Sequence, residues 1–442
     1  ERERVTKLKK VYYQLKLSQI SPLRIGNGEN DISDNDLMCD SRGIPFIPGS
    51  SMAGVLREKY EKLGGKDTEK LFGIIKNDEA TASHIIISDA ICPQKICDNV
   101  KSEFRNVSIS DYKISIRDGV AIDKWGVAKD GHKYDFQVVE TDVPYYCILE
   151  WSGDDEENEN EVIEGLDILV KDIVKHGIQL GARTTRGYGK MKVEVRKHQF
   201  DFPNCIDEWL DFNPWSESDF GGEKVYLDNE DKSEDGQFDR IEVQFKVIGS
   251  FSIRVNMERI EKAPDSVVMV NKDSKPVVPG TTWAGVFRHH MQEILSHIMS
   301  DNNDERTALD CLFGRGRADN TLSRIRFGET IIEGGKPYVL TRNAVERFTQ
   351  APKNSALFTD EFWQGGVGTL EIMIDKGKMS KLQRQLLEVS LLDLDNGMLT
   401  FGGSTGTGHG RVEVMKLNVN GMDYTENLKS GSMGFLEGLH EY

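Results

Sequence analysis

Long apolar runs are absent from this chain of 442 residues. No stretch of about 18 or more apolar residues occurs, which argues against a transmembrane helix. The charged start at 1–10 lacks the apolar core of a signal peptide. The six cysteines are spread thinly, so no disulfide framework is indicated. Together these absences predict a soluble protein of the reducing cytoplasm.

Two of the cysteines raise the question of a metal site. Cys92 and Cys97 form a CxxxxC pair, and His84 and His132 lie elsewhere in the same half of the chain. Such a pair supplies two of the four ligands of a zinc knuckle, but a second ligand pair is not in place. Incidental cysteines therefore remain the alternative to zinc binding.

Positive charge is in short supply as well. The chain has 56 Lys and Arg against 73 Asp and Glu, which gives a net charge of −17. This balance argues against a protein that wraps indiscriminately around nucleic acid. It leaves open a groove with a local basic lining, because binding depends on the local potential.

The strongest signal in the sequence is a short motif that occurs twice. PGSSMAGVLR at 48–57 aligns position by position and without a gap with PGTTWAGVFR at 279–288. A Pro-Gly turn, two hydroxyls, a glycine and a terminal arginine in the same order are hard to obtain by chance. An LFG triplet follows in both halves, at 71–73 and at 312–314. We therefore predict two tandem copies of one domain.

Apolar periodicity places the expected elements in the same order in both copies. Alternating residues predict strands at 11–17 and at 241–247. After the first motif, apolar spacing predicts a helix over 52–63, with Ser50 and Ser51 as N-cap candidates. A β-rich domain with one or two packed helices, made twice, predicts an α+β fold of tandem ferredoxin-like (RRM-like) domains.

Acidic stretches mark the predicted domain boundaries and one loop. The turn-rich, acidic stretch at 216–239 predicts a linker between a first domain at 1–215 and a second domain at 240–442. A further acidic run, DDEENENE at 154–161, is predicted to be a solvated loop that precedes a helix.

Each copy also carries a glycine-rich loop before its last predicted strand. The first loop is GARTTRGYGK at 181–190, and the second is GGSTGTGHGR at 402–411. Glycines let a backbone approach phosphate and present its amides, and the first loop adds three cations. The second loop keeps only Arg411, so its grip on phosphate is expected to be weaker or to depend on hydroxyls and amides. A role as tight turns alone remains the alternative for both loops.

The motif at 48–57 and the loop at 181–190 together resemble the RAMP superfamily of CRISPR systems. Within it, the chain resembles the Cas7 backbone subunits of type III effector complexes, and its two copies resemble the fused Cas7 subunits of type III-D-like complexes. The resemblance implies tandem RAMP domains with inserted hairpins that bind CRISPR guide RNA and target RNA. The implied protein partners are a Cas10-type large subunit, Cas5-like and further Cas7-like subunits, and small subunits.

In that family each copy presents an aspartate from the loop after the first strand, and this residue supports metal-dependent cleavage of the paired target RNA. Asp34 precedes Pro48 by the same spacing by which Asp265 precedes Pro279. The resemblance thus implies that both are catalytic, with Asp36 as the fallback in the first copy. A lone carboxylate fits a bound Mg²⁺ or Mn²⁺, or assistance to proton removal. Turn aspartates also cap backbone amides, and this alternative stays open.

The same resemblance implies a set of RNA-binding residues in the motifs and the glycine-rich loops. This set is Ser50, Ser51, Arg57, Arg183, Arg186, Lys190, Thr281, Thr282, Arg288 and Arg411. The hydroxyls and the helix N-terminus suit phosphate oxygens. For Arg57 and Arg288, capping or a salt bridge on the helix is the alternative.

Two predicted hairpins are candidates for a wedge that kinks the guide–target duplex. They span 117–140 in the first copy and 342–363 in the second. Such a wedge would align the 2′-hydroxyl for in-line attack. Trp125 and Phe348 are the candidate inserting side chains, although a partly buried packing role is the favoured interpretation of both.

Two other functions remain open at this point. A non-catalytic RAMP backbone or capping subunit has the same fold and binds the same RNA without cleaving it. A guide-precursor-processing RAMP endoribonuclease tends to use a histidine-centred site, but no histidine occurs at one register in both copies. The absence of an HD-type metal motif and of a GGDD cyclase motif argues against the large signalling subunit.

Overall fold

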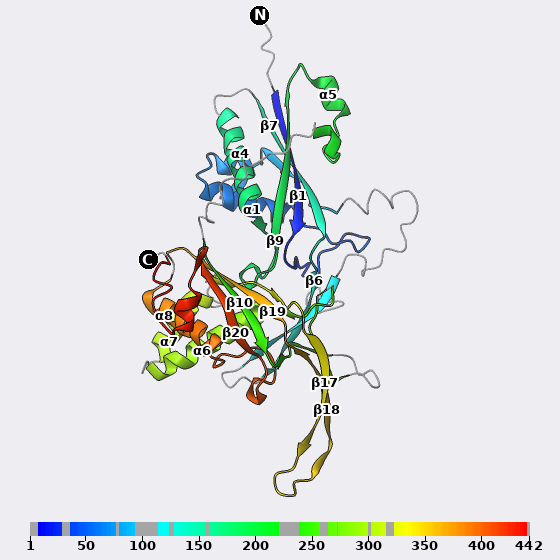
Figure 1. Cartoon of the computed structure of the whole chain (residues 1–442). Helices are drawn as coiled ribbons and strands as arrows, with labels where there is room; N and C mark the ends of the chain where they lie inside the picture. The colour runs from blue at the N-terminus through cyan, green and yellow to red at the C-terminus, as the bar shows by residue number, and fades with distance from the viewer. Residues whose placement is uncertain are drawn as a thin grey trace, which may run out of the picture. The chain divides into compact units, whose positions relative to one another are not determined.

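The chain separates into two compact units in the computed structural model (Figure 1). The described residues are 8–28, 36–76, 79–92, 114–122, 128–154, 159–220, 238–256, 264–271, 273–298, 302–314, 322–377 and 379–439. The first unit comprises residues 1–117, 134–184 and 188–232, and the second comprises 118–133, 185–187 and 233–442. Each unit has its own sheet and its own hydrophobic core.

An antiparallel five-stranded sheet forms the centre of the first unit. Its strands lie in the order β4, β7, β1, β9, β8. They are β1 (Leu8–Gln19), β4 (Ile85–Ile87), β7 (Pro144–Asp154), β8 (Ile178–Gln179) and β9 (Lys190–Asp201). Helices α1 (Gly49–Lys62) and α4 (Glu159–His176) pack against each other and against the sheet (Figure 1). Smaller elements are α2 (Thr68–Phe72), β2 (Ile74–Lys76) and β3 (Glu79–Thr81).

Alternation along β1 explains why helices cover one face of this sheet. Val11, Tyr13, Leu15 and Leu17 point to the same face and are fully buried. They join a core that includes apolar side chains of α1 and α4. The strand predicted at 11–17 is therefore the middle of a longer strand.

The second unit has a sheet of the same kind. Its strands lie in the order β15, β19, β10, β20, β21. They are β10 (Phe238–Ile248), β15 (Ile325–Phe327), β19 (Val367–Asp375), β20 (Arg411–Val419) and β21 (Met422–Asp423). The helices of this unit are α6 (Gly280–Ile298), α7 (Asn302–Phe313), α8 (Lys381–Asp395) and α9 (Thr425–Lys429). Contacts of α6 with α7, α6 with α8, and α8 with α9 build its helical layer.

Both sheets have one topology. Along the chain the main elements follow the order strand, helix, strand, strand, helix, strand, and the first strand pairs with both the third and the fourth. In space the order is second, third, first, fourth in each unit. This is the ferredoxin-like βαββαβ arrangement, so the predicted α+β fold with two tandem copies is confirmed.

A β-hairpin is inserted at the same place in both units, between the second and third strands. The strands are β5 (Ile114–Ile122) and β6 (Ala128–Val139), which follow β4 in the chain, and β17 (Lys336–Val345) and β18 (Pro352–Gln364), which follow β15. Only the base of the β5–β6 hairpin, up to Arg117 and from Tyr134, belongs to the first unit. The β17–β18 hairpin extends away from the body of its unit (Figure 1). Its base joins a sheet with β11 (Ser250–Phe251), β12 (Arg254–Asn256) and β13 (Ser266–Val268), and nearby β14 (Val277–Val278) pairs with β16 (Thr330–Ile331).

The repeated motif begins its helix earlier than the sequence predicts. Helix α1 starts at Gly49, and its N-cap residue, Pro48, makes no side-chain capping bond. The N-cap role predicted for Ser50 and Ser51 is therefore wrong, because both lie inside the first turn. Instead, the Gly49 amide donates to Asp89 Oδ1 at 2.7 Å.

Glycine is required at this helix start because the backbone of a neighbouring strand passes very close. A Cβ at Gly49 would lie 2.4 Å from the carbonyl oxygen of Ile87. At Gly280, the counterpart in the second motif, it would lie 2.2 Å from the carbonyl oxygen of Phe327. Both motifs thus press a helix N-terminus against the end of a strand.

A segment after β9 covers the outer face of the first sheet. It contains α5 (Ile206–Asp211) and the 3-10 turn η3 (Glu217–Phe220). Phe220 is 1% exposed and packs with Tyr12, Ile148 and Phe200, which alternation places opposite the helical layer. Residues 217–220, predicted to belong to the linker, are thus packed onto the first unit. No helix in the described part of the chain is long and apolar enough to cross a membrane.

Candidate nucleic-acid interface

The loop that leads into the repeated motif has the same hydrogen-bond framework in both units. Asp40 Oδ1 accepts the amides two and four residues further along the chain, at 2.8 and 3.0 Å. Asn271 Oδ1 accepts the two equivalent amides, both at 3.0 Å. Asp40 and Asn271 stand at the same distance in sequence before their motifs, so the loops align without a gap up to the motif.

Asp40 therefore has a structural role in its turn. Its carboxylate also receives the Arg42 guanidinium, with Nη2 2.6 Å from Oδ2. Burial works to raise the pKa of Asp40, but the amides of Ile44 and Arg42 and the guanidinium outweigh it, and the pKa is lowered. Asp40 is held as a carboxylate by its own turn.

Backbone pairing carries the alignment further toward the predicted catalytic residues. Leu37 and Val268 each pair with the chain that leaves the first strand of their unit, and the gapless alignment of the loops matches them to each other. Continued toward the N-terminus, this register makes Asp265 the counterpart of Asp34, which lies outside the described residues. Asp36, the fallback candidate in the first copy, is buried, and the gapless alignment matches it to a valine, Val267, in the second unit.

Asp265 is exposed and lies directly before β13. Its amide donates to Thr359 O at 2.7 Å, and its Oδ2 accepts the Thr359 amide at 2.8 Å. This contact ties the loop to β18 and is the amide cap that the sequence leaves as an alternative. Oδ1 accepts no hydrogen bond from the residues that the structure describes.

A buried carboxylate, Asp360, collects three donors beside this loop. Ser266 Oγ lies 2.7 Å from Oδ1, Arg342 Nη2 lies 2.5 Å from Oδ2, and Arg254 Nη2 lies 3.4 Å from Oδ2. Burial works to raise the pKa of Asp360, but the bonds from Ser266 and Arg342 and both positive charges lower it. Sequence reasoning missed this network, because its members come from separate segments of the chain.

His409 of the second glycine-rich loop lies next to the same network. Its ring stacks on Phe362 with centroids 4.3 Å apart, and its Nδ1 lies 2.8 Å from Ser250 Oγ. Burial and the positive charges of Arg342 and Arg254 lower its pKa. The imidazole is therefore neutral at pH 7.

The two glycine-rich loops have one backbone conformation although their sequences differ. Four positions share a positive φ: Gly181 and Gly402 (81° and 85°), Arg183 and Ser404 (62° and 60°), Gly187 and Gly408 (85° and 91°), and Gly189 and Gly410 (75° and 80°). Each loop contains a 3-10 turn, η2 (Thr184–Arg186) or η4 (Thr405–Thr407). A Cβ added at Gly189 or Gly410 would lie 1.8 or 1.9 Å from a backbone oxygen. The turn itself thus requires these glycines.

The cations predicted to bind phosphate occupy different settings in the two loops. Arg183 stacks over Phe136, with its guanidinium carbon 4.1 Å from the ring centroid. Arg186 ends η2, and Lys190 begins β9. In the second loop Arg411 is exposed at the start of β20.

The arginines that end the two motifs make equivalent capping contacts. Arg57 Nη1 donates to Gly73 O at 3.1 Å, and Arg288 Nη1 donates to Gly314 O at 3.5 Å. Both glycines close the LFG triplet with a positive φ. Arg288 also binds Asp310 at 2.8 Å. These contacts are those of the capping alternative, while RNA binding by both arginines stays a prediction.

The hydroxyl residues of the motifs lie in the first helical turns. Ser50 is exposed, whereas Ser51, Thr281 and Thr282 are half-buried. The amide of Gly49 is occupied by Asp89, so this helix start already holds a carboxylate where an anion would bind. Phosphate binding there stays a prediction for these four hydroxyls.

The hairpin base of the first unit contains a closed ion pair that the sequence did not indicate. Arg117 Nη2 lies 2.8 Å from Glu140 Oε1, and the two side chains are 3% and 5% exposed. Arg117 also lies over the ring of Tyr188, which the shared loop backbone makes the counterpart of His409. This pair joins the hairpin to the first glycine-rich loop.

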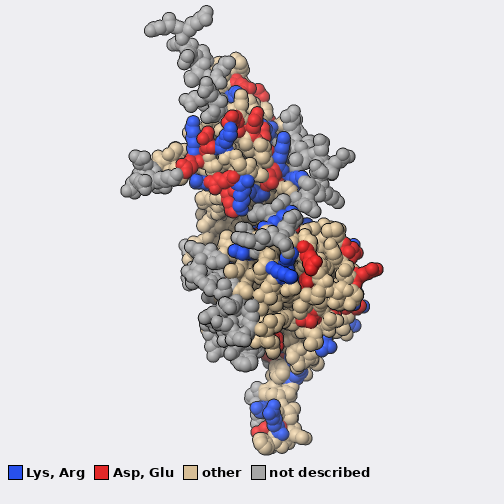
Figure 2. Space-filling view, turned by 90° about the vertical axis from the view of Figure 1, so that its left-hand side faces the viewer, with Lys and Arg blue, Asp and Glu red and all other residues tan. Residues whose placement is uncertain are grey.

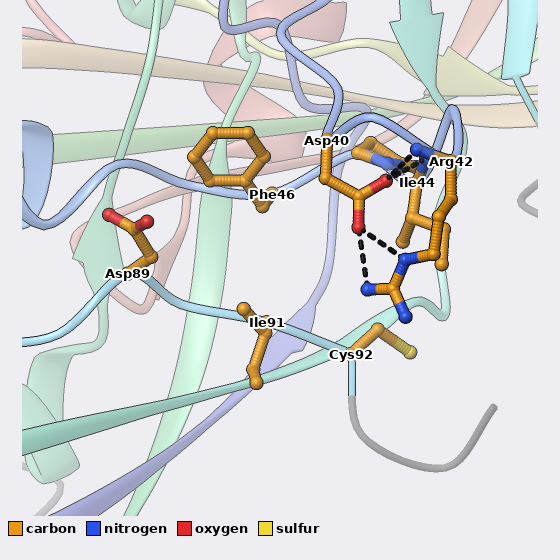
Figure 3. Close-up of a pocket in the computed structure, with 8 residues that line it drawn as sticks. Asp40, Arg42, Ile44, Phe46, Asp89, Ile91 and Cys92 are labelled. Atoms are coloured by element: carbon orange, nitrogen blue, oxygen red, sulfur yellow. Dashed lines mark hydrogen bonds and ion pairs between the residues drawn. The ribbon is translucent and has the colours of Figure 1, made fainter. Parts of the chain in front are cut away.

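A small pocket in the first unit contains one of the candidate zinc ligands. Asp40, Arg42, Asp89 and Cys92 contribute to its lining (Figure 3). Cys97, the other half of the pair, lies outside the described residues. No group of three or more His, Cys, Asp or Glu side chains that would hold a metal ion occurs in the described part.

The family model of the RAMP superfamily matches residues 16–192 and 224–413, well over half of the chain. The chain therefore belongs to the RAMP superfamily, and it carries two RAMP regions. Membership supports a CRISPR-associated, RNA-binding protein. A search of curated proteins found no match.

Proposed function

We propose that this chain is a Cas7-like backbone subunit of a type III CRISPR ribonucleoprotein, with two Cas7 copies fused as in type III-D-like complexes. Each unit binds guide RNA without regard to sequence, and base pairing selects the target RNA. The target is cleaved at two positions, one per unit. The observation that carries the proposal is the repeated loop register, in which Asp265 corresponds to Asp34.

The proposed chemistry asks little of the protein beyond alignment and charge stabilisation. RNA supplies its own nucleophile, the 2′-hydroxyl beside the scissile phosphate. Asp265 fits this task, because it is exposed and its described contacts engage only Oδ2. Oδ1 is then available to accept a proton or to bind a hard cation.

A divalent cation fits this site only if Asp265 shares its coordination with groups from outside the protein. Asp265 offers a carboxylate oxygen, which suits Mg²⁺ or Mn²⁺. The described residues offer no cluster of three ligands, so water and phosphate oxygens of the RNA would complete the shell. When bound, such an ion neutralises charge that develops on the phosphate.

The β17–β18 hairpin has the composition of a wedge. Phe348 at its tip is 98% exposed, so the packing role favoured from the sequence is wrong for this residue. Arg347 and Lys353 flank the same turn, and Figure 2 shows Lys and Arg side chains at the far end of this hairpin. An exposed aromatic ring between cations suits insertion into a stacked duplex. Trp125 lies outside the described residues.

The test uses the assembled complex with guide RNA and an end-labelled target in Mg²⁺. Asp265→Ala is expected to remove one cleavage product and to leave the other, and Asp34→Ala is expected to do the reverse. Asp273→Ala is the matched control, because Asp273 is an exposed acid of the same loop. Survival of both cuts in the double variant Asp34→Ala/Asp265→Ala would contradict the assignment.

A non-catalytic RAMP backbone subunit is the second candidate. The observation in its favour is the bond between Asp265 Oδ2 and the Thr359 amide, which already gives the carboxylate a structural role. In that case target RNA bound to the wild-type complex stays intact in Mg²⁺ and in Mn²⁺. Guide loading and target binding would be retained.

A further inference from the structure

The ion network of the second hairpin base carries more positive charge than its carboxylate neutralises. Arg254 and Arg342 both bind Oδ2 of Asp360, while Oδ1 accepts the Ser266 hydroxyl. The Asp360 side chain is 8% exposed, whereas Arg254 is 40% and Arg342 25% exposed. One guanidinium charge is therefore left over, and it faces solvent.

Both guanidinium groups are held in place by their neighbours. Arg342 lies over the rings of Phe358 and Phe362, with 5.0 and 5.4 Å to the centroids. Arg254 Nη2 donates to Ser404 Oγ of the glycine-rich loop at 2.6 Å. Fixed guanidinium forks lose little entropy on binding, and their geometry matches the oxygens of a phosphate.

In the first unit the arginine near the glycine-rich loop comes from a different position in the chain. In the first unit Gly26 pairs with Leu37. In the second unit Arg254 pairs with Val268, so Arg254 stands where the first unit has Gly26. The loop position occupied by Arg183 in the first unit is occupied by Ser404 in the second. The first unit thus has an arginine on the glycine-rich loop, and the second unit has one on the strand beside that loop. The second glycine-rich loop has no arginine at this position of its sequence, but the Arg254 side chain lies beside it.

From this exchange we propose that Arg254 and Arg342 form a binding site for one phosphodiester group of an RNA strand that follows the second glycine-rich loop. The proposal rests on the RNA-binding function proposed above. Ser266, which holds Asp360, directly follows Asp265 in the chain. The bound phosphate therefore lies next to the candidate catalytic loop, and the site fixes the strand in register with it.

The test is RNA binding by the full chain at several salt concentrations, measured by fluorescence anisotropy with a labelled single-stranded RNA and with a guide–target duplex. Arg254→Ala is expected to lower the affinity roughly tenfold. It should also reduce the salt dependence of binding by about one counterion. A larger loss with the single strand assigns the phosphate to the guide, and a larger loss with the duplex assigns it to the target.

Two further variants separate phosphate binding from a purely structural role. Arg254→Gly/Ser404→Arg recreates the arrangement of the first unit and is expected to restore affinity and salt dependence. Arg240→Ala is the control, since Arg240 is 55% exposed and paired with Glu371; it should change the affinity less than twofold. If Arg254→Ala binds RNA like the wild type, or the double variant stays as weak as Arg254→Ala, the phosphate site is wrong. A wild-type chain without RNA affinity would overturn the proposed function as well.

Discussion

The two hairpin bases are both fixed by ion pairs with a buried carboxylate, but the ratio of arginines to carboxylates differs between them. In the first unit Arg117 and Glu140 form an ion pair that is almost fully buried. In the second unit two arginines share Asp360, and both are open to solvent. The scaffold thus needs a hairpin fixed to the glycine-rich loop, but it does not need a particular charge there. Two arginines that share one carboxylate in the second unit therefore indicate a task beyond stability.

The largest expected effect comes from breaking the closed pair. Arg117→Ala leaves the Glu140 carboxylate buried with the Ser115 hydroxyl but without the positive charge of Arg117, which should cost roughly 3–5 kcal/mol of folding free energy. Arg254→Ala should cost much less, because Asp360 keeps Arg342 and Ser266. Urea unfolding monitored by circular dichroism provides the measurement. Equal losses in the two variants would remove the distinction between a closed and an open network.

The cover over the first sheet gives the next prediction. Phe220→Ala removes a fully buried ring from the cluster of Tyr12, Ile148 and Phe200, so a loss of about 3 kcal/mol is expected. Phe348→Ala is the control, because that ring is almost completely exposed. Denaturant midpoints should fall for the first variant and stay within error for the second. A stable Phe220→Ala variant would mean that the segment does not belong to the folded unit.

Substitution at the helix start tests the close approach shared by both motifs. Gly49→Ala places a methyl group 2.4 Å from a backbone oxygen, so a loss of about 1–3 kcal/mol is expected. Gly54→Ala in the same helix meets no atom within 4 Å and should be neutral or stabilising by up to about 1 kcal/mol. Opposite signs in thermal unfolding would support the close approach, and equal signs would refute it.

The smallest effect is a titration that reports on the surplus charge. His409 has a lowered pKa, so protonation is resisted in the folded state and stability falls as the pH drops below about 6.5. Removing a neighbouring cation should raise this pKa. NMR titration of the ring is expected to show a higher value in Arg254→Ala than in the wild type. An unchanged value would mean that Arg254 does not act on the imidazole.

Local patterns predicted much of the fold, and contacts between distant residues escaped prediction. The repeated motif predicted two copies, and alternation predicted the central strands, because both signals lie within short windows. The cap of α1 was mispredicted because Asp89, 40 residues beyond Gly49, supplies it. The pairing of Arg254 with Asp360 spans 106 residues and has no local signature. The position of Asp265 relative to the second motif could be predicted from the sequence, but its hydrogen bond with Thr359 could not.

The segment that packs over the first sheet has a consequence for how a nucleic acid can be read. It lies at 202–220, between the two stretches that match the family model. In RRM-type domains, aromatic side chains on this outer face stack on bases and so recognise them. Here Tyr12 and Phe200 on that face are already occupied by Phe220. A strand held by the loops and the hairpin would keep its Watson–Crick edges unengaged by the sheet and open to a complementary strand.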